Sequence, residues 1–222
     1  MPPTAIFSSK GALAYAELRR LILTAELAPG ARLSQDEFAE SMGMSITPLR
    51  EAVRQLASEG LVTMSPHRDV RVSAASADEA RQLLEVRLSL EPFATRLAAE
   101  RRTDAQLRAM TEAADRLLPV NRRTGEEAIE AHRAFHQAVH AASGNDVMIR
   151  MLDDLWDKSD RYRRLGLTLP EGDAPRTEDL KQHHELLGLI TAGDGPGAEV
   201  LSRAHIAHSL ASTVLAVLDT TS

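Results

Sequence analysis

The sequence contains no cysteine, few aromatic residues and no long apolar segment. Without cysteine the 222-residue chain forms no disulfide. Aromatic residues make up 3% of the chain and hydrophobic residues 43%, so we expect helices that pack through aliphatic side chains. No apolar run approaches the roughly 20 residues of a membrane-spanning helix, and the N-terminus lacks a charged head followed by an apolar core. These absences predict a cytoplasmic protein without a membrane partner.

The two parts of the chain differ in charge and in histidine content. The net charge is -6, but residues 1–75 carry 8 basic and 8 acidic side chains, so the acidity lies after residue 75. All of the 8 histidines except His67 lie there too, between His132 and His208. The sequence pattern also changes near residue 75, from mixed α and β to helical. We therefore predict two domains, 1–75 and 76–222.

The first domain is predicted to begin with two helices. Apolar residues repeat at a helical spacing within residues 12–27, and the Pro29-Gly30 pair ends that segment. Ser34 is the expected N-cap of a short second helix, which Gly43 ends.

The segment "SITPLREAVRQLASEGLV" (45–62) is predicted to hold a third helix. Thr47 is the expected N-cap, with Pro48 at the first helical position. A buried stripe with i, i+3, i+4, i+7 spacing is expected from Leu49, Ala52, Val53 and Leu56. Beyond this helix, the runs 61–64 and 70–73 predict a β-hairpin with a five-residue loop, which makes a small wing.

A short helix, a tight turn and a second helix with polar and cationic side chains in its first turn are typical of a helix-turn-helix. The hydroxyl groups at the entrance of the second helix suit phosphate, and Arg50 suits a guanine edge or a phosphate. The residues predicted to contact DNA are Ser45, Thr47, Arg50, Arg54, His67 and Arg68, the last two at the tip of the wing. The alternative is an ordinary packed bundle with a solvated arginine face.

From residue 76 onward the sequence predicts only helices. They are placed near residues 77–101, 104–118, 125–142, 146–166, 176–192 and 197–218. Capping-box patterns precede three of them, with Ser76, Thr103 and Thr124 as the expected N-caps. The predicted fold class is therefore mainly α, a winged helix-turn-helix followed by an all-α bundle.

Histidines recur in this helical part at spacings that bring several of them together. Three that lie four residues apart share one stripe of a predicted helix: His132, His136 and His140. His183 and His205 are each 11 residues from Asp194, in the turn of a predicted helical hairpin, so they lie at about the same level on adjacent helices. Imidazoles from several helices suit a divalent zinc, nickel or copper ion. The alternatives are surface histidines, or core histidines hydrogen-bonded to carboxylates such as Glu185.

Residues 17–62, "ELRRLILTAELAPGARLSQDEFAESMGMSITPLREAVRQLASEGLV", resemble the winged helix-turn-helix of GntR-type transcriptional regulators. The resemblance is carried by the "L.PG..L" turn, the "FAE" helix, the "S.TPLREA" entrance and the "L..EGLV" exit. It implies a homodimer on a palindromic double-stranded DNA operator. Three positions depart from the family pattern: Ile46 and Asp36 replace arginines, and Asp69 replaces a glycine of the wing. These departures predict weaker binding or a different half-site.

Residues 83–101, 132–145 and 183–206 are similar to the FCD form of the ligand-binding domain in the FadR subfamily. The resemblance implies six or seven helices around a metal ion. The metal positions map to His132, His136, His183 and His205. Because His132 replaces a usual carboxylate, four neutral ligands would leave the charge of the ion uncompensated until an acidic effector binds. Arg87, in the "R...E" segment, is expected to hold the effector's carboxylate; the alternative for this residue is a surface salt bridge.

Together these features predict a ligand-responsive, homodimeric transcription factor, a repressor by resemblance, and not an enzyme. Its expected cofactor is a divalent transition metal, zinc or nickel, and its expected ligand is a small carboxylate that alters DNA binding. The alternatives are an all-helical histidine metalloenzyme and a regulator that has lost metal and effector binding. His140, His184 and His208 are expected near the metal or at the surface.

Overall fold

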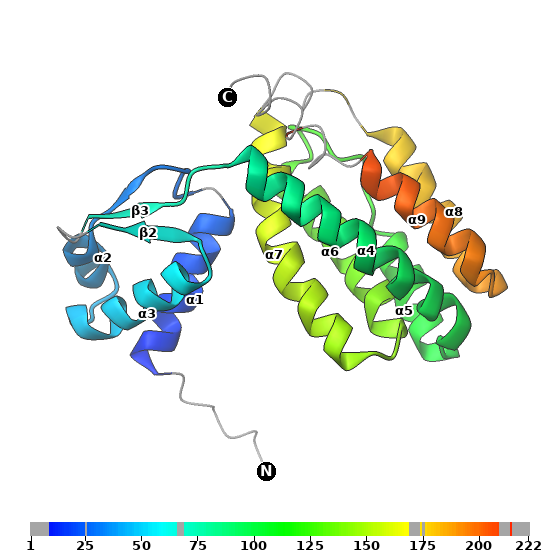
Figure 1. Ribbon diagram of the computed structural model, residues 1–222, viewed down its shortest axis with the longest axis horizontal. Helices are drawn as coiled ribbons and strands as arrows, with labels where there is room; N and C mark the ends of the chain where they lie inside the picture. The colour runs from blue at the N-terminus through cyan, green and yellow to red at the C-terminus, as the bar shows by residue number, and fades with distance from the viewer. Residues whose placement is uncertain are drawn as a thin grey trace, which may run out of the picture. The chain divides into compact units, whose positions relative to one another are not determined.

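The computed structural model describes residues 9–24, 26–65, 69–168, 174, 176–208 and 214 (Figure 1). The chain divides into two compact units, Met1–Ala75 and Ser76–Ser222, and each unit has its own hydrophobic core. The fold is mainly α, as predicted. Across the described part of the chain, no helix is long and apolar enough to cross a membrane.

The first unit combines three helices with a small antiparallel sheet. Its helices are α1 (Lys10–Leu23), α2 (Gln35–Ser41) and α3 (Ile46–Ser58). Its strands are β1 (Arg32–Leu33), β2 (Val62–Met64) and β3 (Val70–Val72), in the order β1-β3-β2. The sequence predicted the β2–β3 hairpin but not β1, because a two-residue strand carries no readable alternation.

The core of the first unit forms where α1 packs on α3. Buried residues at helical spacing supply it from both helices: Ala14, Leu18 and Ile22 on α1, and Leu49, Ala52, Val53 and Leu56 on α3. The predicted apolar stripe of α3 is thus confirmed. It fixes which side of α3 faces the protein and leaves the opposite side to solvent.

α3 begins earlier than predicted. Ser45 is its N-cap, without a capping hydrogen bond from the side chain, so the prediction that Thr47 caps the helix is wrong. Pro48 lies at the third helical position. Proline has no amide hydrogen to donate. It is tolerated there because the first-turn amides of a helix have no intrahelical acceptor, so no helical hydrogen bond is lost.

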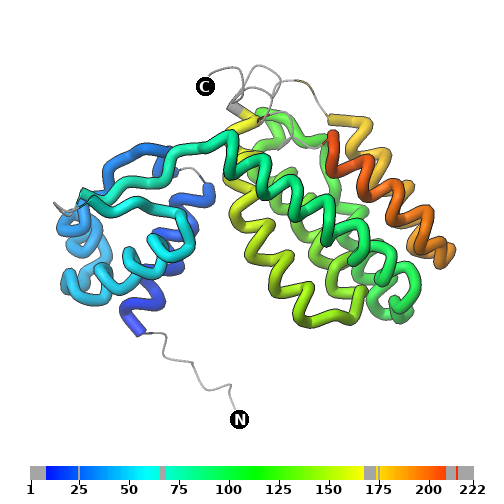
Figure 2. Tube along the Cα trace, viewed as in Figure 1, coloured from blue at the N-terminus to red at the C-terminus, as the bar shows by residue number. Residues whose placement is uncertain are grey.

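The second unit is a helical bundle whose chain trace can be followed in Figure 2. Its described helices are α4 (Ala77–Arg101), α5 (Asp104–Ala114), α6 (Gly125–Ala142), α7 (Asp146–Thr168), α8 (Thr177–Ala192) and α9 (Gly195–Ala207). α4 is the central helix, since it packs against α6, α7, α8 and α9. A side chain on any of these four helices can therefore approach one shared interior.

The helix ends in this unit test the predicted boundaries. α5 ends at Ala114, not at residue 118, and Pro119 disfavours helix in the residue before it. α9 begins at Gly195 rather than 197, capped by the Asp194 side chain, and ends at Ala207. Most of the predicted continuation to residue 218 lies outside the described residues.

The predicted N-caps have mixed outcomes. Thr103 forms a complete capping box with Gln106. Ser76 accepts from the Glu79 amide, but the Glu79 carboxylate bonds to α7 instead of returning to the cap. Thr124 is the N-cap of α6 as predicted, but its side chain makes no capping bond; its hydroxyl instead donates to the Pro119 carbonyl in the preceding loop.

Candidate DNA-binding surface and histidine site

The predicted DNA-contacting residues of α3 lie at and after the N-terminal end of the helix. Ser45, Thr47 and Arg54 are exposed, and Arg50 is half-buried. Among the described residues, none of these four side chains has a hydrogen bond or ion pair. Their polar groups are therefore available to a partner. The other two predicted contacts, at residues 67 and 68, lie outside the described residues.

The three positions that depart from the family pattern have different environments. Asp36 is exposed in the first turn of α2, and Ile46 packs against the core of the first unit. Asp69 forms ion pairs with Arg32 at 2.8 Å and Arg71 at 2.9 Å. These contacts, the hydrogen bond from Arg71 above all, hold the pKa of the Asp69 carboxyl below its ordinary value. Asp69 therefore carries a negative charge beside the wing.

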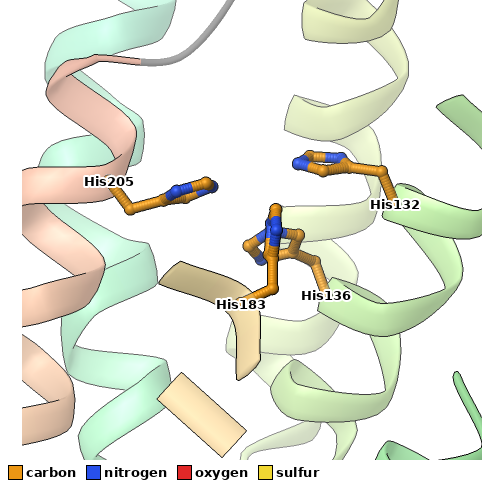
Figure 3. Close-up of side chains that lie close together, drawn as sticks. All are labelled: His132, His136, His183 and His205. Atoms are coloured by element: carbon orange, nitrogen blue, oxygen red, sulfur yellow. The ribbon is translucent and has the colours of Figure 1, made fainter. Parts of the chain in front are cut away.

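The four predicted metal ligands come together in the second unit. His132 and His136 are one turn apart on α6, His183 lies on α8 and His205 on α9, and Figure 3 shows their rings turned toward a common centre. One nitrogen from each ring falls within a group whose members all lie within 4.8 Å of one another. The Nε2 atoms of His136 and His183 are 3.0 Å apart. Three helices thus contribute to one site.

The environment keeps these imidazoles neutral. Burial holds the pKa of His132, His136 and His205 well below the ordinary value, and neighbouring cationic groups such as Arg163 and the other imidazoles act in the same direction. Burial likewise lowers the pKa of His183 to about 3. A neutral imidazole has a free lone pair, which is the form that binds a metal.

One ligand is also held in a suitable orientation. His205 Nδ1 lies 2.9 Å from Gln182 Oε1. Since an amide oxygen can only accept, Nδ1 donates the hydrogen and Nε2 keeps its lone pair for the centre of the cluster. His132 Nδ1 is buried without a hydrogen-bond partner among the described residues. An unpaired buried nitrogen of this kind fits a site that a metal ion would complete.

The spacing of the ring nitrogens also fits a metal ion. Nitrogen ligands about 2.1 Å from one ion lie about 3.4 Å apart in a tetrahedron. The four nitrogens lie within 4.8 Å of one another, so small movements of the rings would bring them to this spacing. An all-imidazole set suits zinc, nickel or copper.

A buried charged network borders the histidines. Arg87 Nε donates to Glu91 Oε1 at 2.6 Å, and Trp156 Nε1 donates to the same oxygen at 3.0 Å. Burial alone would raise the pKa of Glu91, but Arg87 and His140 hold it below its ordinary value. The alternative of a surface salt bridge at Arg87 is wrong, because Arg87 is 2% exposed and Glu91 1%. The predicted effector role of Arg87 stays a prediction.

A second buried arginine was not predicted. Arg163 on α7 stacks on the ring of Trp156 at 4.0 Å, and its Nη1 donates to Asp160. Burial lowers its pKa to about 10, and the charge of Arg87 contributes. Nothing local in "DRYRRLG" shows that Arg161 and Arg163 are buried while Arg164 is partly exposed, whereas the i, i+4 spacing of Arg87 and Glu91 was readable.

Beside the histidines lies a small cavity of about 20 Å³. It is lined by His132 and His205, by Arg163 and Arg176, and by Asp179 and two aliphatic residues. Arg87 lines a separate, smaller cavity. Among the other histidines, His140 is buried beside Glu91 and His136, whereas His184 and His208 are exposed.

Two family models match the chain. Residues 11–72 match "Bacterial regulatory proteins, gntR family" and residues 82–208 match "FCD domain". An uncharacterised helix-turn-helix transcriptional regulator in an unstable DNA locus of Streptomyces ambofaciens is 36% identical over 199 residues, covering 86% of this chain and 80% of that protein. The transcriptional repressor GlaR of Escherichia coli is 28% identical over 202 residues, covering 86% and 90%.

The fold is also similar to that of a solved structure. The structure of E. coli McbR/YncC superposes with a TM-score of 0.76 at 25% identity, and the match covers 96% of this chain and 99% of that one. Both units are therefore represented in a single related regulator.

Proposed function

Since the chain belongs to the GntR family of bacterial regulators and carries an FCD domain, we propose that it is a homodimeric, metal-binding repressor whose DNA binding responds to a small organic acid. That it is a helix-turn-helix transcriptional regulator follows from the family. The relatives and structural neighbours are regulators, so the metalloenzyme alternative is excluded. Binding to the chromosome would place the protein in the cytoplasm.

The observation that carries the metal part of the proposal is the convergence of four neutral histidines. Three helices supply His132, His136, His183 and His205, burial keeps the rings unprotonated, and Gln182 orients one of them. A bound zinc or nickel ion would tie these helices together, and an anionic ligand would bind it as a fifth ligand beside the four imidazoles. With four neutral ligands, that anion is needed to balance the charge of the ion.

The DNA-binding part of the proposal rests on α3. Ser45 and Thr47 at the helix entrance would contact phosphate, and Arg50 and Arg54 would reach the major groove or its edge. These four side chains have no hydrogen-bond or ion-pair partner among the described residues, which supports a role in binding DNA. His67 and Arg68 of the wing remain proposed contacts.

Dimerisation and repression are supported by physics and by the relatives. A single recognition helix reads only a few base pairs, whereas a two-fold dimer on a palindrome doubles the contacts. One of the relatives, GlaR, is named a repressor. An effector would act by binding one arrangement of the dimer better than the other.

The test is an effector titration of DNA binding. Full-length protein purified without a metal-affinity tag is mixed with a labelled operator selected from random duplexes, and fluorescence anisotropy follows binding as small carboxylic acids are added. We expect at least one acid to change the Kd for the operator about 10-fold, within the usual range of allosteric coupling. The response should disappear after dialysis against a chelator and return with zinc or nickel.

Two results would contradict the proposal. If the protein carries no metal and the acids leave the Kd unchanged, the chain is a regulator without metal or effector. If the metal is present but no acid changes DNA binding, the ion has a structural role only.

A further inference from the structure

We propose that Arg161 and Tyr162 on α7 couple the histidine site to the segment that connects the two units. The inference rests on the proposed function, because it names how the metal ion affects DNA binding. Four residues form a hydrogen-bonded group at the start of α4, which we call the Tyr162 cluster: Ser76, Glu79, Arg161 and Tyr162. Contacts join this cluster to the histidines on one side and to the connecting segment on the other.

The Tyr162 cluster ties the first turn of α4 to α7. The Tyr162 hydroxyl donates to Glu79 Oε2 at 2.5 Å and accepts from the Ser76 amide at 3.3 Å. Arg161 Nη2 donates to the same Glu79 oxygen at 2.5 Å. Burial of Tyr162 and its hydrogen bond to Glu79 raise the pKa of the phenol, so the hydroxyl keeps the proton that it donates.

The hydrogen bonding of this cluster is incomplete. Arg161 is 3% exposed, and its Nε and Nη1 atoms are buried without a hydrogen-bond partner among the described residues. Buried N–H groups without an acceptor are costly, which reduces the free energy that holds the cluster together. An arrangement of small net stability can be shifted by a ligand that favours it over the alternative. The cluster is therefore suited to respond to the histidine site.

Contacts between α6 and α7 join the cluster to the histidines. Arg163 follows Tyr162 on α7 and lines the same cavity as His132. Arg133, next to His132 on α6, donates to one oxygen of Asp160 at 2.7 Å, and Arg163 donates to the other oxygen at 2.5 Å. The turn of α7 that carries Tyr162 is thus bonded to the turn of α6 that carries a proposed metal ligand.

This turn of α7 is buried on every side. Residues 159–163 are each between 1% and 4% exposed, and successive residues of a helix project about 100° apart. A close-packed turn moves as a body, so a shift of Arg163 on one side also moves Tyr162 on another. A divalent ion at His132 repels the Arg163 guanidinium and makes Asp160 its favoured partner. We therefore expect the metal-bound protein to favour the closed Tyr162 cluster.

The segment between the two units is short and is anchored at both ends. In the first unit, Ser73 bonds to carbonyl groups through its amide at 3.0 Å and its hydroxyl at 2.6 Å. In the second unit, Ser76 bonds to Tyr162. Two residues, Ala74 and Ala75, lie between these anchored positions. Closing the Tyr162 cluster therefore restricts the segment that leads to the DNA-binding unit.

The test follows hydrogen exchange at the Ser76 amide, which donates directly to the Tyr162 hydroxyl. Full-length protein is compared by NMR without metal and saturated with zinc alone, and operator binding is measured under the same conditions. In the parent, zinc should slow this exchange about 10-fold and change the Kd for the operator by a similar factor, within the usual range of coupling. In Tyr162→Phe, zinc should still bind, but both responses should disappear.

Matched variants control for the loss of a hydroxyl and of a charge. Tyr15→Phe removes the hydroxyl of the other tyrosine, which bonds to Glu59 in the first unit, and should keep both zinc responses. Glu79→Ala, at a partly exposed position, removes the acceptor shared by the cluster and should lose them. Asp78→Ala removes the same charge from an exposed residue of that helical turn and should keep them. If Tyr162→Phe does not fold, the comparison of Glu79→Ala with Asp78→Ala decides the question.

The outcomes separate this inference from the proposed function. If zinc binds but leaves the exchange of Ser76 unchanged, the Tyr162 cluster is not coupled to the histidine site, although the metal site stands. The same conclusion follows if the operator Kd responds to zinc equally in the parent and in Tyr162→Phe. If zinc does not bind, the metal part of the proposed function fails, and this inference fails with it.

Discussion

The two recognition sites of this regulator are built in opposite ways. On α3, the side chains proposed to contact DNA, such as Thr47 and Arg50, have no partner within the described chain. In the second unit, the cationic side chains of the cavity each have acidic partners, and Arg163 retains a single unpaired Nη2. On an exposed surface that binds DNA, the hydrogen-bond donors can be solvated by water in the free protein. A buried cavity cannot, because each unpaired group there is costly.

This difference predicts how the two sites respond to substitution. Changes on the exposed side of α3 should alter DNA binding with little effect on folding. Changes around the cavity should alter stability and ligand binding together, since the same contacts serve both.

The largest expected effect is on DNA binding by Arg50→Ala. A bidentate arginine-to-guanine contact discriminates by about 1–3 kcal/mol, which is about 5- to 150-fold per half-site. Specific binding in a mobility shift should therefore be lost, while the midpoint of thermal unfolding changes little. Arg108→Ala removes the same charge from the exposed surface of α5 and should bind like the parent protein. Unchanged operator binding by Arg50→Ala would refute the role of α3.

The next effect is on stability, at the buried pair. Glu91→Ala leaves Arg87 without its carboxylate in the interior and should lower the free energy of unfolding by about 3–5 kcal/mol. The matched change at an exposed ion pair, Asp78→Ala beside Arg81 on the same helix, should change it by less than about 1 kcal/mol. Urea denaturation of the metal-free proteins measures both. Similar losses for the two variants would contradict the burial of the Glu91 pair.

The buried histidines predict a pH dependence for the metal-free protein. Their folded pKa values lie below the ordinary value, so the unfolded chain binds protons first as the pH falls. Stability is therefore full above pH 6.5 and is lost below it. Each such histidine should remove about 1.4 kcal/mol between pH 7.5 and 5.5. His140→Gln should reduce the dependence of the free energy of unfolding on pH, whereas His184→Gln, at an exposed position, should leave it unchanged. A free energy of unfolding that does not change with pH in the parent would be inconsistent with neutral buried rings.

The smallest effect is expected at the wing. Asp69 neutralises Arg32 and Arg71, which lie opposite each other on β1 and β3. Asp69→Asn should free both cations for phosphate and raise DNA affinity several-fold at low salt. The dependence of log K on log salt should steepen by up to about 2, since each phosphate contact contributes about 0.9. Asp36→Asn, at an exposed site on α2, removes the same charge and is the control. Equal slopes in the two variants would show that the ion pairs of Asp69 with Arg32 and Arg71 have no effect beyond net charge.

How far the sequence predicts the structure also differs between the two sites. α4 and α6 begin and end at the predicted residues, because caps and apolar spacing are local signals. The convergence of the four histidines followed from spacing and from the family resemblance. The burial of Arg163 did not, because its partners Trp156 and Asp160 make sense only once α7 is packed against the bundle. Similarly, β1 exists only through its pairing with β3.

Whether the four histidines hold a metal ion is decided by the metal content of three proteins purified without a metal-affinity tag: the parent, His183→Ala and His184→Ala. The two histidines are neighbours on α8, one buried in the cluster and the other exposed. We expect about one zinc or nickel ion per chain in the parent and in His184→Ala, and loss of the ion in His183→Ala. Equal metal content in the two variants would contradict a metal site at the four histidines.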